Sequence, residues 1–506
     1  MKDERKREIM NSFIKGIPKA QADETRPLYH FHAPSQWMDD PNGIIYYQGY
    51  YHLMYSCNPF SDSHRAGPEY KQEPTEEEWG KPGPHWNEGI TGWGHARSKD
   101  LIHWEHLPMA LYPSEDQGEF FCWFGSTMIR KDQTPICFYT SIGKKEGPIF
   151  GTTQWAATGS SDLMQWEKVT GNPVMPRSTN PIEVMRWCDP HVFTHGEKVY
   201  CLIGGKLDDP VSGVPVICLY EALNDQLTSW KYNGIVFRHP NHSLRSMECP
   251  NIFEMNGKWV LMLSPHGPLE YWVGQLNFET CHFEVEKMGY LDRGTHLYAS
   301  NYMRDAKQRI LLWAAIEGFS ENVGWRGCLC LPRVLKLKKD NTLCLQPAEE
   351  LAQLRKNKKY WPNVELCNGW HLQDEIANTA EIIFQTRGVK PFSLSLCNGR
   401  QSVFSLSWNG THIGFGKEAE AFEISQPASF EVQILIDRTV IEVFINHSEC
   451  YTGVIPSFGG RRSMRLEGEE TLEPLEIFEL DASDIFTYSY GTWKDGRFIS
   501  NGKEIG

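Results

Sequence analysis

A turn followed by an aromatic residue recurs at a nearly regular interval through the first two-thirds of the chain, and this repeat limits the possible folds strongly. The segment SKDLIHWEHL around Trp104 returns as SSDLMQWEKV around Trp166, as LNDQLTSWKYN around Trp230 and, more weakly, as NFETCHFEVEK around Phe283. The intervals are 62, 64 and 53 residues, with short β-rich runs such as TPICFYTS and KWVLMLS between the copies. Such a period is typical of a β-propeller with one four-stranded blade per unit.

The segment WMDDPNGIIYYQGYYHLMYS before the first copy has the same strand-rich character, so the sequence predicts five blades. A large β-sandwich with coincidental aromatic turns is the alternative. After about residue 335 the repeat gives way to a charged, partly helical pattern and then to alternating strands such as FEVQILIDRTVIEVFIN, which predict a β-sandwich. We therefore expect an all-β protein with an N-terminal segment at 1–27, a five-bladed β-propeller at 28–340, a linker at 341–364, a C-terminal β-sandwich at 365–490 and a tail at 491–506.

Charge and composition exclude several kinds of partner. The 506 residues carry a net charge of −14, and the pI is about 5.7. These values leave no electrostatic footprint for nucleic acid or an anionic membrane and favour a small neutral partner. The sequence lacks a run of about 18 apolar residues, and its start lacks the apolar core and cleavage site of a secretory signal. We therefore expect a cytoplasmic protein, and the sequence leaves its oligomeric state open.

The cysteines do not predict a metal site. All 14 are scattered, with one C-x-C at Cys328 and Cys330 and no C-x-x-C. In a reducing compartment they are expected to be small buried apolar side chains.

Two adjacent aspartates precede a tight turn in the segment WMDDPNG. Pro41 fixes its own φ and biases Asp40 towards extended backbone, while Asn42 and Gly43 favour the turn, which places Asp40 at a strand end. Because side chains of neighbouring extended residues point to opposite faces, Asp39 and Asp40 are not expected to serve one reacting atom together. The segment alone does not decide which of them acts.

Two further acids stand in similar surroundings, Asp189 in RWCDPHVF and Glu248 in SMECPNIF. If inner strands of three blades carry them, Asp40, Asp189 and Glu248 converge on the central funnel of the propeller. Crowded carboxylates push their pKa values apart, which leaves one ionised as a nucleophile and one protonated as an acid, as glycoside cleavage requires. The aromatic residues that offer flat faces to a sugar ring near these acids are Trp37, Trp93, Trp123 and Trp187.

These segments resemble the motifs of glycoside hydrolase family 32, the family of invertases, inulinases and levanases. WMDDPNG resembles its W-M-N-D-P-N-G motif, with Asp39 in place of the asparagine, RWCDPHVF resembles its R-D-P motif, and MECPN resembles its E-C motif, all in the family's order. Further similar segments extend the resemblance from about residue 28 to about 480: YHLMYSCNP, WGHARSKDLIHWEHLPMALYP, CWFGSTMI, LDRGTHLYAS, GWRGCLCLPRVLKL and IDRTVIEVFIN.

The resemblance implies a retaining hydrolase of β-fructofuranosides, such as sucrose or short fructans, that needs no metal or organic cofactor. It implies that Asp40 is the nucleophile, that Glu248 is the acid/base, and that Asp189 stabilises the transition state by gripping hydroxyls of the fructofuranose ring. The family's five-bladed propeller and β-sandwich agree with the repeat. The predicted substrate-binding residues are Trp37, Asp39, Asn42, Trp93, Trp123, Phe124, Ser126, Arg186, Cys188, His296 and Trp313.

Several positions depart from the family pattern. Cys188 stands where the R-D-P motif has its arginine, and Arg186, two residues upstream with the same strand parity, is a candidate substitute. His296 and Leu297 replace the usual Asp-Phe, and a polar insertion from Ser61 to Gly92 predicts a loop at the funnel mouth. The loss of a fixed cation beside the sugar predicts a weak invertase whose better substrate is a less usual fructofuranoside.

Three other interpretations stay open: a fructosyltransferase of the same family, an arabinofuranose-cleaving glycosidase, and a non-catalytic sugar-binding propeller. The presence of Asp40, Asp189 and Glu248 disfavours the last of these. Trp93 and Trp123 are compatible either with sugar platforms or with the core of a blade.

Overall fold

The structure of the chain is a computed structural model that describes residues 3–62, 90–143, 151–207, 213–320, 322–366, 372–416, 421–423, 428–457, 460–494, 497–500 and 503–505. Most of the insertion predicted between Ser61 and Gly92 falls at 63–89, outside the described residues. Strands predominate, which confirms the all-β class. Within the described ranges no helix has the length and apolar character to span a membrane.

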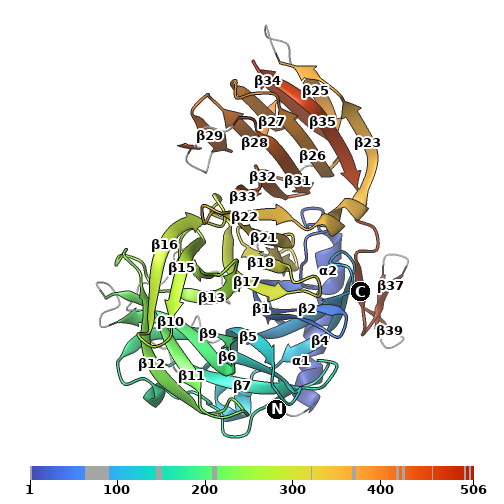
Figure 1. Ribbon diagram of the computed structural model, residues 1–506. Coiled ribbons are helices and arrows are strands. Elements are labelled where there is room, and N and C mark those ends of the chain that lie inside the picture. The colour runs from blue at the N-terminus through green and yellow to red at the C-terminus, as the bar shows by residue number, and fades with distance from the viewer. Residues whose placement is uncertain are drawn as a thin grey trace.

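Five antiparallel sheets form the larger part of the molecule (Figure 1). Their strands are β1 (Gln36–Tyr47), β2 (Tyr50–Asn58), β3 (Gly92–Ser98) and β4 (Trp104–Leu111); β5 (Glu119–Ile129), β6 (Pro135–Gly143), β7 (Thr153–Gly159) and β8 (Trp166–Lys168); β9 (Val184–His195), β10 (Lys198–Leu207), β11 (Pro215–Ala222) and β12 (Trp230–Arg238); β13 (Glu248–Met255), β14 (Lys258–Ser264), β15 (Glu270–Asn277) and β16 (His282–Tyr290); and β17 (Leu297–Arg304), β18 (Ile310–Ile316), β21 (Arg333–Leu337) and β22 (Leu343–Pro347). Inner strands such as β11 and β14 are continuous apolar runs because both faces of their sheets are covered.

The first strands of these sheets contact one another in a closed ring, β1 to β5, β5 to β9, β9 to β13, β13 to β17, and β17 back to β1. Each of them bulges at the same place, where two of its residues lie opposite one residue of the second strand. The doubled residues are 39–40, 123–124, 189–190, 249–250 and 299–300. Because a bulge re-aims the side chains it carries, the ring presents one pair of redirected residues per sheet.

Two further antiparallel sheets lie at the other end of the molecule (Figure 1). One contains β23 (Arg355–Trp361), β24 (Val364–Glu365), β26 (Thr379–Thr386), β31 (Glu431–Asp437), β32 (Val440–Ile445), β33 (Glu449–Val454) and β35 (Thr471–Leu480), and the other contains β25 (Leu372–Ile376), β27 (Phe392–Asn398), β28 (Gln401–Trp408), β29 (His412–Phe415), β30 (Phe422–Glu423) and β34 (Arg462–Gly468). Side chains of both sheets, such as Ile382, Ile434, Leu394 and Leu466, share one apolar core.

The remaining elements attach to these sheets. The helices α1 (Asp3–Lys15) and α2 (Ile17–Ala22) lead into the first strand, and Ile9 and Phe13 of α1 join the same apolar cluster as Leu53 of β2. Short 3₁₀ helices are η2 (Glu115–Gln117), η3 (Arg177–Thr179) and η4 (Glu349–Leu354). Among the short strands, β19 (Trp325–Arg326) pairs with β1, β20 (Cys328–Leu329) pairs with β18, and β36 (Phe486–Tyr488) pairs with β4. A separate three-stranded sheet contains β37 (Thr492–Lys494), β38 (Arg497–Ser500) and β39 (Lys503–Ile505).

Most of the segment 341–364, which the sequence predicts as a linker, forms sheet. β22 completes the fifth sheet, η4 follows, and β23 is an edge strand of the next sheet. Its sequence RKNKKYW resembles a linker because exposed edge strands carry lysines that block pairing with other chains. The predicted end of the sandwich at 490 is also corrected, since β36 leaves those two sheets and pairs with β4.

A buried network of charges joins the two ends of the molecule. Arg333 on β21 donates to Oε2 of Glu442 on β32 at 2.8 Å and to Oδ2 of Asp292 at 2.9 Å. The ring nitrogens of His30 lie 2.9 Å from Oδ2 of Asp437 and 3.1 Å from Oε1 of Glu442. These side chains are at most 1% exposed. Because a buried charge is tolerated only with its partners in place, the network fixes how the two ends pack together.

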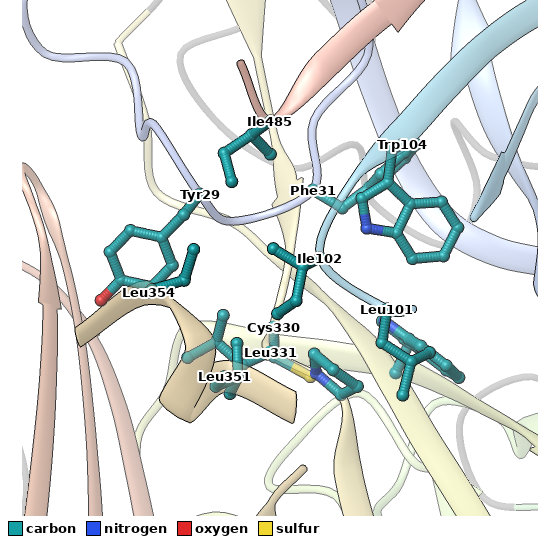
Figure 2. Close-up of a pocket in the computed structure, with 12 residues that line it drawn as sticks. Tyr29, Phe31, Leu101, Ile102, Trp104, Cys330, Leu331, Leu351, Leu354 and Ile485 are labelled. Carbon is teal, nitrogen blue, oxygen red and sulfur yellow. The ribbon is translucent and has the colours of Figure 1, made fainter. Parts of the chain in front are cut away.

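A small enclosed cavity lies beside this junction (Figure 2). Tyr29 of the N-terminal segment, Ile102 before β4, Leu351 of η4 and Ile485 before β36 are among its lining residues. Its lining is predominantly apolar and brings together segments from both ends of the chain. We interpret it as imperfect packing in the core and not as a ligand site.

Candidate active site

Asp40 occupies the bulge of β1, where the ring of first strands brings several carboxyl groups together. Burial raises its pKa well above the usual range, and the negative charges of Asp189, Glu248 and Glu317 act in the same direction. Four carboxyls from separate parts of the chain therefore influence one another across one site. Such crowding disfavours simultaneous ionisation of all of them.

Asp189 occupies the bulge of β9 in a left-handed backbone conformation, with φ of 68°. Its Oδ2 accepts a 2.9 Å hydrogen bond from the backbone N–H of Cys249 on the neighbouring sheet, and its own N–H donates to Oγ1 of Thr140 at 2.7 Å. Burial and the charge of Glu248 raise the pKa of Asp189 to about 7. The thiol of Cys188 also bonds to this carboxyl, which lowers that pKa in part.

Glu248 begins β13, directly before the bulge. Its Oε1 lies 2.8 Å from Nε2 of His266 and 4.0 Å from Nη1 of Arg186, and its Oε2 accepts a 2.9 Å hydrogen bond from the hydroxyl of Tyr298. Burial alone raises the pKa of Glu248, but His266, Arg186 and Tyr298 together outweigh it and lower this pKa to about 2. In the unliganded site Glu248 is therefore the carboxyl that ionises most readily.

Asp39 forms part of a second carboxyl pair beside the first site. Burial, the charge of Glu317 and the charge of Asp40 raise the pKa of Asp39 well above its usual range, and a hydrogen bond to Glu317 acts in the same direction. Arg326, which follows Trp325 on β19 and lies in register with Trp37 of β1, partly offsets this effect. These influences favour the neutral, protonated form of Asp39.

Carboxyls on three separate first strands act on one another in this site, and each has its own fixed partners. Such a set is suited to displacement at an acetal carbon, where one carboxylate attacks and another group protonates the leaving oxygen. Among the described residues, no group of three or more His, Cys, Asp or Glu side chains is arranged to hold a metal ion.

Several predicted binding residues lie at or near these acids. Nη1 of Arg186 lies 4.0 Å from Oε1 of Glu248. The thiol of Cys188, which is 1% exposed, bonds to the carboxyl of Asp189. Nδ1 of His296 lies 3.0 Å from the backbone oxygen of Glu317. Trp37 is 6% exposed and precedes Asp39 on β1. Trp123 is partly exposed beside the bulge of β5.

Two other predicted binding residues lie in the core. Trp93 is fully buried and donates from Nε1 to the backbone oxygen of Trp123, and Trp313 is 1% exposed in the cluster that holds α1. Their rings are surrounded by apolar side chains, so they offer no face to a sugar.

Three more predicted binding residues link strands instead of facing a ligand. Asn42 is fully buried with its amide 2.8 Å from Oγ of Ser56. Ser126 donates from Oγ to the backbone oxygen of Pro190 at 2.8 Å and so joins β5 to β9. Phe124 packs with Cys249 beneath the carboxyls. These residues hold the ring of first strands in place.

Sequence reasoning missed four residues of the site: His266, Tyr298, Glu317 and Arg326. Tyr298 and Arg326 lie inside segments that carry the family resemblance, LDRGTHLYAS and GWRGCLCLPRVLKL, but they are not part of its acid motifs. His266 stands in the turn between β14 and β15 and Glu317 follows β18, and neither position carries a local pattern. Only the packing of neighbouring sheets brings them to the acids.

Comparison with known proteins identifies the family. The sequence model of the glycosyl hydrolases family 32 N-terminal domain matches residues 30–70 and 78–347. The chain belongs to glycosyl hydrolase family 32. The match covers all five first strands and the three acids, so the ring and its carboxyls belong to the part that family 32 shares.

Similar proteins of known name agree with this assignment. A sucrose-6-phosphate hydrolase of Bacillus subtilis is 27% identical over 88% of this chain and 92% of its own length. A levanase of the same species is 30% identical over 69% of this chain and 50% of its own length. A mutant beta-fructofuranosidase of Bombyx mori, solved in complex with sucrose, is 24% identical and superposes with a TM-score of 0.78 over 96% of this chain and 100% of its own. This chain is therefore a glycoside hydrolase by family, and the structural likeness supports the fold.

Proposed function

We propose that this family 32 enzyme is a retaining β-fructofuranosidase that acts on sucrose, short fructo-oligosaccharides or a less usual fructofuranoside. The observation that carries the proposal is the meeting of Asp40, Asp189 and Glu248 from three first strands of one ring. Similarity to a sucrose-6-phosphate hydrolase and a levanase supports a fructoside as substrate. The five sheets then correspond to the blades of a five-bladed propeller, and the two remaining sheets to a C-terminal β-sandwich.

In the proposed reaction, Asp40 attacks the anomeric carbon of the fructosyl group as Glu248 gives a proton to the leaving oxygen. Asp189, fixed by the backbone N–H of Cys249, binds hydroxyls of the fructofuranose ring. Water then attacks the anomeric carbon as Glu248 accepts its proton, the bond from that carbon to Asp40 breaks, and fructose leaves with its original configuration. Because burial and crowding raise the pKa of Asp40, binding of substrate must favour its ionised form before attack.

A product assay tests the proposal. Purified enzyme is incubated with sucrose, sucrose 6-phosphate, a fructosyl trisaccharide, inulin, levan and an aryl arabinofuranoside, and free fructose and larger sugars are quantified by chromatography. We expect free fructose from the small fructosides, with Asp40→Asn as the inactive control for contaminants. Oligosaccharides in place of free fructose indicate a transferase, and arabinose release with no fructose release overturns the proposal.

The retaining step has its own test. In water containing methanol, the fructosyl group passes to methanol, and NMR of the methyl fructofuranoside reports its anomeric configuration. Retention gives the β-anomer. The α-anomer contradicts a covalent intermediate on Asp40.

A further inference from the structure

Glu248 is held from three directions by residues of three different elements. Arg186 comes from β9, Tyr298 from β17, and His266 from the turn between β14 and β15. His266 makes a close ionic contact, since its Nε2 lies 2.8 Å from Oε1, whereas Nη1 of Arg186 lies 4.0 Å from the same oxygen. The ring of His266 also packs on Tyr298, with centroids 5.7 Å apart. Both ring and hydrogen-bond contacts therefore orient the imidazole towards the acid.

The backbone of His266 supports a specific role. Its φ is 55°, in the left-handed region that costs free energy for residues with a β-carbon. Its side chain is 25% exposed, compared with 16% for Glu248. The turn therefore holds a titratable ring at the edge of the site, in a conformation that local sequence does not favour, with solvent on one side and the acid on the other.

We propose that His266 is a positioning residue that shares one proton with Glu248 and returns it to the carboxylate when substrate binds. The proposal rests on the proposed function, in which Glu248 is the acid. In the proposed cycle the shared proton lies towards Nε2 before the sugar binds. When the sugar excludes water, the Nε2–H bond breaks, its electron pair stays on the nitrogen, and an O–H bond forms on Oε1. The total charge of the pair does not change.

The surrounding charges favour this transfer in the closed site. Attack requires an ionised Asp40, and the charge on Asp40 disfavours a second carboxylate at Glu248 once water has left. Arg186 and the hydroxyl of Tyr298 favour the carboxylate and therefore oppose the transfer. The thiol of Cys249 is buried beside the same acids. Loss of solvent favours the neutral pair of His266 and Glu248, because two opposite charges side by side lose more hydration free energy than two neutral groups.

The pair makes a prediction about pH that a lone glutamic acid does not make. The reactive enzyme must hold one proton on the pair, and the alkaline limb of kcat/KM marks its loss. In the native enzyme that proton is held between Nε2 of His266 and Oε1 of Glu248, which lie 2.8 Å apart. In His266→Gln the amide keeps a hydrogen bond to Oε1, but the proton must reside on Glu248 and leaves at lower pH. We expect the alkaline limb to move down by about one pH unit or more, a loss of about tenfold in kcat/KM above it.

The controls separate proton sharing from structure. Tyr298→Phe removes the 2.9 Å hydrogen bond to Oε2 of Glu248 but leaves both His266 and Glu248 in place. The alkaline limb of its kcat/KM profile should therefore not move to lower pH. An aryl fructoside with a good leaving group needs little protonation, so its kcat/KM should change less than twofold in His266→Gln. Equal loss on both substrates, or an unmoved limb, overturns the role of His266. Thermal unfolding confirms that each variant is folded.

A second measurement does not depend on activity. In protein labelled with ¹³C at glutamate carboxyls, the signal of Glu248 is identified by its absence in Glu248→Gln. We expect it to remain that of a carboxylate down to about pH 4 in the native protein, because ion pairing holds the pKa of Glu248 low. In His266→Gln it should titrate above pH 4. The same titration in both proteins overturns the pairing even if no fructoside is cleaved, and a shifted titration without fructoside cleavage contradicts the proposed function alone.

Discussion

Nη2 of Arg333 donates a 2.8 Å hydrogen bond to Oε2 of Glu442, and neither side chain is exposed to solvent. Arg333→Met leaves two buried carboxylates without their main cation, so we expect the free energy of unfolding to fall by about 3–5 kcal/mol. Urea denaturation measures it. Arg387→Met is the matched control, because its pair with Glu473 is 61% and 46% exposed and should contribute about 1 kcal/mol or less. Similar losses in both variants contradict a special role for the junction.

The same junction should make stability depend on pH. Burial lowers the pKa of His30, but Asp437 and Glu442 outweigh it and raise this pKa from 6.5 to about 9. A raised pKa stabilises the fold fully below about pH 6.5, and the contribution is lost as pH rises through 9. The difference corresponds to at most about 3 kcal/mol. Unfolding measured from pH 6 to 9.5 should show this decline, and His30→Gln should flatten it. A native protein with constant stability over that range contradicts the assignment.

The two adjacent aspartates should differ sharply in effect. Asp40→Asn removes the proposed nucleophile, and we expect kcat to fall by about three orders of magnitude or more with the fold unchanged. Burial and Glu317 raise the pKa of Asp39 and so favour its neutral form, which an amide resembles, and Asp39→Asn should keep most activity. Rates on sucrose and circular dichroism of both variants check this. Equal losses mean that the roles are assigned wrongly.

We infer that Arg186 substitutes for the missing arginine of the family motif. Arg186 reaches to 4.0 Å from Glu248, whereas Cys188 is 1% exposed and bonds to Asp189. Arg186→Met should therefore lower kcat/KM by about ten- to a hundredfold, the value of a charge-assisted hydrogen bond. Cys188→Ser, which keeps a donor to Asp189, should lose less than about fivefold. An increase in activity on sucrose in Cys188→Arg shows instead that position 188 still lacks its cation.

The sequence predicted the all-β class and the family because these depend on local patterns. The aromatic turns near Trp104, Trp166 and Trp230 each belong to one sheet, and the acid motifs are short. Part of the segment predicted as a linker is β23, which carries lysines for a tertiary reason, its position at a sheet edge. A local pattern cannot separate an exposed edge strand from a charged loop.

The substrate-binding residues were harder to predict for the same physical reason. Trp93 and Trp313 are aromatic residues on strands of the five sheets, but the pleat turns them into the core. His266 and Glu317 reach the site from segments with no motif, because neighbouring sheets bring them there. The bulge determines whether the side chain of a strand residue faces the centre of the ring or the core. A shift of one residue in the position of the bulge reverses that direction.

The closed ring of first strands means that β1 contacts β5, its neighbour along the chain, and also β17, which ends more than 250 residues later. During synthesis, the first and second acids are made long before the strand that completes the wall beside them. A nascent or truncated chain that stops before residue 297 has all three proposed catalytic carboxyls and still lacks Tyr298. During refolding, activity should therefore return later than strand content. The return of activity marks the time at which β1 and β17 come into contact and close the ring.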